Sequence, residues 1–210
     1  MTGRRLLPVR LSPSVLTGDL LPRPRVGAIG TYGLGFTRAD EHTDPDDPTL
    51  TTVPVSVRPT RQPQPYRCRS MSGQVHGWPR WSSVLHGDGW AAGWTDYRPP
   101  PDSDADTPVD LRGHLSSEFG ALASGWVRGV IHRLWTVHSR RDVPVDPDQP
   151  STWPPAWGST TLTAVDQLPM AAHSDEWPEL PPGVSYNGVL AELDLDALTD
   201  GRTGGPRSAG

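Results

Sequence analysis

Arginine and aromatic side chains alternate in residues 66–94, which read YRCRSMSGQVHGWPRWSSVLHGDGWAAGW. Aromatic rings beside guanidinium groups can stack nucleobases, and the same side chains dominate the hot spots of protein interfaces. The candidates for such a recognition surface are Arg67, Arg69, Trp78, Arg80, Trp81 and Trp90. Core packing is the favoured interpretation of these tryptophans, because the chain has only 2 Phe among its large apolar side chains.

Histidine and aspartate in the same segment could instead bind a metal ion. His76, His86 and Asp88 lie within it, and His132 lies in a strand-like run further along the chain. Imidazole nitrogens and carboxylate oxygens are the usual zinc ligands outside cysteine sites. A metal-dependent enzyme requires at least three of these side chains to converge. For each histidine alone, a hydrogen-bonded or exposed structural role is favoured.

A glycine-rich stretch, GAIGTYGLG at residues 27–35, is a candidate anion-binding loop. Glycines allow backbone N–H groups to approach a phosphate closely. The spacing matches neither the dinucleotide-binding fingerprint nor the P-loop. We therefore interpret this stretch as a flexible β-turn region.

Composition excludes several kinds of chemistry. The chain contains no lysine, so Schiff-base and P-loop lysine mechanisms are ruled out, and we expect no cofactor. Cys68 is the only cysteine, which excludes an internal disulfide and fits a reducing cytoplasm. The net charge of −5 makes nucleic acid an unlikely partner.

The N-terminal residues resemble neither a signal peptide nor a membrane span, because Pro8, Arg10 and Pro13 interrupt their apolar stretch. We therefore expect a cytoplasmic protein that does not bind a membrane. Its expected partner is an unidentified protein or small molecule.

Proline and aspartate divide the chain into segments. We expect an N-terminal extension at residues 1–24, a β-rich unit at 25–98, an acidic proline-rich linker or loop at 99–108, a second β-rich unit at 109–200 and a disordered tail at 201–210. Glycine begins several strand-like runs, which is typical of bulges and barrel corners. A duplicated pair of small barrels is one alternative, and a single domain is the other.

Short runs with β patterning predict the fold class. Strands are expected at 50–57, 125–138, 160–165 and 187–196. Both faces of the 125–138 run are partly apolar, so both are expected to be covered. One short helix is possible at 116–124. The sequence therefore predicts a mainly β protein, with small barrel-like or sandwich sheets, long Pro/Gly-rich loops and at most one or two short helices.

A family resemblance covers residues 110–196. The run GWVRGVIHRLWTVH, the following Pro/Trp-rich loop, TTLTAVDQLP and the closing YNGVLAELDLD are similar to a group of uncharacterised actinobacterial β-rich proteins. That group has no assigned activity, so the resemblance implies a β fold and assigns no role to any residue.

Three functions remain open on these grounds. The leading hypothesis is a non-catalytic β domain that binds a ligand or a protein. The first alternative is a single-stranded nucleic-acid binder that uses the Arg/Trp residues on one exposed concave face. The second is the metal-dependent enzyme.

Overall fold

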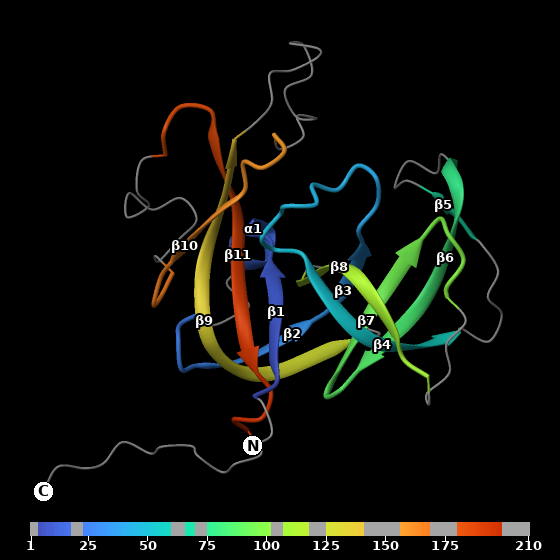
Figure 1. The fold of residues 1–210 in the computed structure, drawn as a ribbon, viewed down its shortest axis with the longest axis horizontal. Coiled ribbons are helices and arrows are strands. Elements are labelled where there is room, and N and C mark those ends of the chain that lie inside the picture. Colours follow the sequence, from blue (N-terminus) through green and yellow to red (C-terminus); the bar gives the residue numbers. More distant parts are fainter. Residues whose placement is uncertain are drawn as a thin grey trace, which may run out of the picture.

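The computed structural model describes residues 4–17, 23–59, 66–69, 75–101, 107–117, 125–140, 156–168 and 180–198. Within residues 58–80 it describes the backbone of 58–59, 66–69 and 75–80 but no side chains. The predicted tail at 201–210 lies outside the described residues. The described part is mainly β (Figure 1), which confirms the predicted fold class.

The strands occupy β1 (Leu6–Leu11), β2 (Ile29–Gly33), β3 (Gly35–Arg38), β4 (Thr51–Pro59), β5 (Tyr66–Arg69), β6 (Val75–Gly87), β7 (Trp90–Asp96), β8 (Val109–Ser117), β9 (Trp126–Arg140), β10 (Thr161–Ala164) and β11 (Val184–Asp194). The strands predicted at 50–57, 125–138, 160–165 and 187–196 correspond to β4, β9, β10 and β11. Alternation of apolar side chains was therefore a sufficient signal for these strands.

One short helix, α1 (Pro13–Thr17), follows β1. A short helix is predicted at 116–124. Its first two residues, Ser116 and Ser117, instead end strand β8, and residues 118–124 lie outside the described residues. Nowhere in the described ranges is there a helix of the length and apolarity that a membrane crossing requires.

Strand pairing closes the sheet on itself. The pairings run from β1 through β11, β9, β7, β6, β4 and β8, and β8 pairs again with β1, so they form a closed 7-strand barrel. β3 pairs with both β7 and β8. β2 and β10 pair with β9, and β5 pairs with β6. Closure removes the free edges that an open sheet of this size would present.

Strands from the two predicted β units pair with one another. β1, from the expected N-terminal extension, pairs along its whole length with β11. β3 and β4 from the first unit both pair with β8 from the second. Strands from both predicted units therefore share one sheet.

The long strand β9 connects the two halves of the molecule. Figure 1 shows it running beside β11 on one side and then bending beneath the molecule toward β7 and β4. Its register with β11 shifts between Glu192 and Leu193, which face Arg133 and Ile131. His132 is thus an extra residue, a β-bulge, and such bulges bend a strand and redirect its side chains.

This bulge reverses which side chains of β9 face the interior. Before it, Val127 and Ile131 are buried in the core; after it, Leu134 is buried in the same core. Strict alternation predicts that Ile131, Trp135 and Val137 share a face, as do His132 and His138. Because of the bulge, His138 instead follows Leu134 on the inward side.

A second bulge lies in β11. Asn187 and Gly188 have no partners between the pairs Tyr186–His138 and Val189–Thr136. Gly188 has φ 104°, and a Cβ there would collide with the carbonyl oxygen of Leu11. Only glycine fits this position, since it tolerates positive φ and lets β1 approach closely.

The core consists mainly of valine and leucine side chains from the closed sheet, together with Trp94, Trp90, Tyr32 and Phe36. Trp94 is 1% exposed and Trp90 is 8% exposed. Trp126 and Trp157 are exposed on the surface. The prediction of a tryptophan-filled core therefore holds for part of the described tryptophans only.

Replacing Gly188 by Ala should destabilise the protein by roughly 3 kcal/mol, because it combines positive-φ strain with a collision against backbone. Gly158 is the matched control. It has φ 69° with nothing near its Cβ position, so Gly158→Ala should cost only about 1 kcal/mol. Urea denaturation of both variants measures the difference. Equal losses would contradict the close approach between β11 and β1.

Candidate functional site

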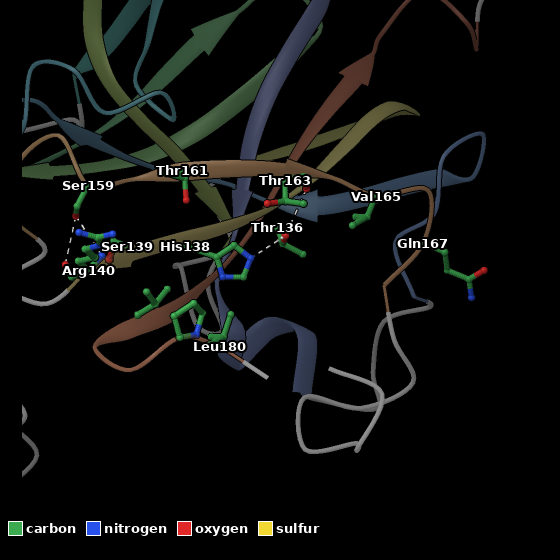
Figure 2. Close-up of a pocket in the computed structure, with 12 residues that line it drawn as sticks. Thr136, His138, Ser139, Arg140, Ser159, Thr161, Thr163, Val165, Gln167 and Leu180 are labelled. Atoms are coloured by element: carbon green, nitrogen blue, oxygen red, sulfur yellow. Dashed lines mark hydrogen bonds between the residues drawn. The ribbon is translucent and has the colours of Figure 1, made fainter. Parts of the chain in front are cut away.

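A cavity of about 480 Å³ lies over the face that β9 and β10 share beyond the β9 bulge. We call it the His138 cavity. Figure 2 shows His138 at its centre, with Thr136 and Thr163 on one side and Leu180 on the other. The lining residues are Thr136, His138, Ser139, Arg140, Ser159, Thr161, Thr163, Val165, Gln167, Leu180, Pro181 and Val184. A cavity of this size suits a small organic molecule.

The cavity begins where the inward face changes from apolar to polar. Leu134 belongs to the core, and the next inward positions of β9 are Thr136 and His138. β10 places Thr163 opposite Thr136 and Thr161 opposite His138. These four side chains form a polar floor, and Leu180, Pro181, Val184 and Val165 supply apolar walls. Apolar walls with a few fixed polar groups are typical of ligand sites.

Hydrogen bonds determine which nitrogen of His138 carries the proton. The hydroxyl of Thr136 donates to the carbonyl oxygen of Thr163 at 3.3 Å. The distance from Thr136 Oγ1 to His138 Nε2 is 2.9 Å. We assign the Thr136 proton to the bond with Thr163; since a hydroxyl has one proton, Thr136 then accepts from His138, and Nε2 carries the hydrogen. In the neutral ring, Nδ1 is then an acceptor with a free lone pair.

His138 Nδ1 is buried and has no hydrogen-bond partner among the described residues. Figure 2 shows this second nitrogen turned away from Thr136, toward the side of the cavity where Leu180 lies. Desolvation lowers the pKa of His138 below its ordinary value, so the ring is neutral at pH 7. A buried acceptor without a donor is unfavourable unless a bound molecule supplies one.

The neighbouring strand holds the His138 ring in place. Tyr186 faces His138 directly across the β9–β11 pair, and the two ring centroids are 5.9 Å apart at 56°. Burial raises the pKa of Tyr186, so its hydroxyl stays protonated. In the adjoining bulge, Asn187 Nδ2 donates to Ser139 Oγ. This hydrogen bond holds the bulge of β11 against β9 beside the cavity.

Only some of the predicted recognition residues can be placed. Trp81 is half-buried in β6. Trp90 lies in the core, which agrees with the favoured core-packing interpretation of this tryptophan. The side chains of Arg67, Arg69, Trp78 and Arg80 lie outside those the structure describes. The predicted Arg/Trp surface thus stays a prediction.

The predicted metal ligands come from separate elements. His86 is on β6, Asp88 follows it in the β6–β7 turn, and His132 is the bulge residue of β9. Asp88 forms an ion pair with Arg5 at 2.6 Å. Among the described residues, no group of three or more His, Cys, Asp or Glu is arranged to hold a metal. The side chain of His76 is not described, so a site that includes it stays a prediction.

A second histidine cluster has the residue types of a catalytic triad but not its geometry. Thr49 Oγ1 lies 2.8 Å from Asp47 Oδ1 and 3.1 Å from His114 Nδ1. The carboxylate can only accept, so Thr49 donates to Asp47 and accepts from His114. Desolvation lowers the pKa of His114, which opposes the attraction of Asp47. Thr49 is 3% exposed, and its hydroxyl proton points to Asp47 and away from His114. The cluster therefore stabilises the loop before β4 and does not activate a nucleophile.

Sequence reasoning missed the floor of the His138 cavity. Thr161 and Thr163 in TTLTAV, and Thr136 and His138 in WTVH, each occupy alternate positions of a predicted strand. Polar side chains at alternate positions of a largely buried strand such as β9 are a signal for a polar site, whereas β10 is largely exposed. Recognising it required knowing that the β9 bulge turns these positions inward.

The His138 ring should titrate below the ordinary histidine pKa of about 6.5 and should carry its neutral proton on Nε2. Long-range ¹H–¹⁵N NMR spectra of the histidine rings, recorded from pH 4 to 8, measure both properties. His42, which is exposed, serves as the internal reference. A neutral ring protonated on Nδ1 would contradict the hydrogen-bond assignment.

Comparisons with known proteins give no relative for this chain. No family model, curated protein or solved structure matches it. Function is therefore inferred from the chemistry of the cavity.

Proposed function

We propose that this chain is a non-catalytic binding protein, and that the His138 cavity holds a small, largely apolar molecule bearing one O–H or N–H donor. The apolar body of the ligand would lie against Leu180, Pro181 and Val184. Its donor would reach the Nδ1 lone pair of His138. This arrangement makes the ligand supply the hydrogen bond that the described residues leave unmade.

The buried Nδ1 acceptor is the observation that carries this proposal. With Thr136 donating to Thr163, His138 carries its proton on Nε2 and keeps Nδ1 as an acceptor rather than a donor. A site built around a buried acceptor discriminates strongly against analogues that lack the donor, because the protein group then stays unpaired.

Binding suits these residues better than acid–base catalysis. The hydroxyl of Thr136 gives its proton to a backbone carbonyl, so it is not held for transfer to His138. Activated nucleophiles need the opposite arrangement, in which the hydroxyl donates to the histidine. His138 therefore acts as a fixed acceptor that orients the ligand.

Phenol and anisole provide a direct test, because they have similar rings and only phenol can donate. Phenol should bind the full-length protein at least about fivefold more tightly than anisole, since one satisfied hydrogen bond to a buried acceptor is worth about 1–3 kcal/mol. Titrations followed by ¹H–¹⁵N NMR measure both affinities and show whether the amides of β9 and β10 shift. Equal binding of the two compounds, or shifts elsewhere only, would refute the proposal.

His138→Leu should abolish the preference for phenol, because leucine fills similar space without an acceptor. His42→Leu is the matched control, since His42 is exposed in a loop, and it should keep the wild-type preference. If His138→Leu still prefers phenol, another group accepts the hydrogen bond and the assignment of His138 fails.

Phenol affinity should also fall as pH decreases through the lowered pKa of His138. Protonation converts Nδ1 from an acceptor to a donor, so the acidic form cannot accept the ligand's hydrogen. Affinity is therefore complete above that pKa and lost below it. Isothermal titration calorimetry at a series of pH values measures the change, and anisole binding should show no such pH dependence.

A further inference from the structure

A second cavity, of about 330 Å³, lies along the edge of β2. Its lining includes Arg23, Arg25 and consecutive residues 28–32, together with Ile131 and Gln167. β2 pairs with β9 along its other edge. The cavity is therefore bounded by two guanidinium-bearing side chains and by the main chain of an edge strand.

The hydrogen-bond pattern of β2 shows which amides face this cavity. Leu34 N–H donates to the carbonyl oxygen of Gly125, which precedes β9, so the amide of Leu34 points toward β9. In the antiparallel pair of β2 and β9, Tyr32 lies opposite Val127 and Gly30 lies opposite Gly129. Alternate residues of a strand direct their N–H groups to opposite edges. The N–H groups of Ile29 and Thr31 therefore point away from β9, and no described strand pairs with β2 on that side.

The two arginines have no acidic partner among the described residues. Neither Arg23 nor Arg25 takes part in an ion pair there, whereas Arg4, Arg5, Arg98 and Arg133 each do. None of the described residues that line the cavity carries a carboxylate. Tyr32, whose ring packs across Gly30, also lines it, and burial raises the pKa of Tyr32 to about 12, so its hydroxyl remains a donor.

We propose that this second cavity binds the oxyanion of a small organic molecule, a carboxylate or a phosphate monoester, through Arg23, Arg25 and the N–H groups of Ile29 and Thr31. Guanidinium groups match the planar or tetrahedral arrangement of oxyanion oxygens, and such charge-assisted hydrogen bonds are the strong ones. The N–H groups of alternate residues on one strand edge add fixed partial positive charge. A volume of about 330 Å³ suits a small molecule rather than a protein segment.

Phenyl phosphate and benzoate are the probes, because they present the two oxyanions on the same ring, and phenol is the uncharged control. At least one of the two anions should shift the Ile29 and Thr31 amides in ¹H–¹⁵N NMR spectra of the full chain, and added NaCl should weaken the binding. The tighter probe identifies the oxyanion class. If neither anion shifts these amides at millimolar concentration, the proposal is refuted.

Substitutions can measure separately how much the arginine side chains and the main-chain N–H groups contribute to anion binding. Arg23→Gln with Arg25→Gln should weaken binding at least about tenfold. Arg128→Gln is the matched control, since Arg128 is exposed on β9 opposite Thr31 and does not line the cavity. Unchanged affinity in the double variant, or an equal loss in the control, would overturn the proposal.

Thr31→Pro removes the amide hydrogen without breaking a bond to β9, a change that edge strands tolerate. It should weaken anion binding, whereas Thr31→Ala should not. Circular dichroism checks that both variants stay folded, and if Thr31→Pro does not fold, the arginine variants still decide the outcome. His138→Leu should leave anion binding unchanged, so this proposal stands or fails separately from the one for the His138 cavity.

Discussion

Strand β9 must pair along both edges while it turns from one half of the molecule into the other. On one edge it pairs with β11 and then, at Val127, with β7, and on the other edge it pairs with β10 and β2. A regular strand of this length would twist but could not make so sharp a bend, and the extra residue His132 allows it to do so. Closure of the sheet, burial of Leu134 and the inward position of His138 all depend on this one bulge.

The two cavities follow from the same constraint. Beyond the bulge, polar residues of the adjacent strand β10 extend the inward face of β9, and Leu180 and Pro181 line the same cavity, so the interior ends in a partly polar pocket. Before the bulge β2 pairs with the edge of β9, and no strand among the described residues pairs with the outer edge of β2. Gln167, in the segment after β10, lines both cavities. The residues that bring β10 and β2 onto one edge of β9 therefore also separate the His138 cavity from the cavity lined by Arg23 and Arg25.

Electrostatics distinguishes these sites from the histidine and aspartate residues with structural roles. Asp194 is buried, but it pairs with Arg4 and accepts the N–H groups of Asp196 and Ala197, so its charge is fully compensated. Asp196 is held by Arg5, which keeps the pKa of this carboxyl below its ordinary value. His138 Nδ1 and the guanidinium of Arg25 have no such partners among the described residues. Uncompensated polar groups beside a cavity indicate binding, whereas compensated ones indicate stability.

The sequence by itself determined the β class and the positions of β4, β9, β10 and β11, because alternation of side chains is a local property of an extended chain. It also excluded lysine chemistry through composition alone. Only the tertiary structure decided that β1 belongs inside the sheet, that Trp90 is buried and that His138 faces a cavity. The physical reason is that a bulge inserts a single residue and reverses the orientation of every later side chain, and whether a bulge forms depends on partner strands far away in the sequence.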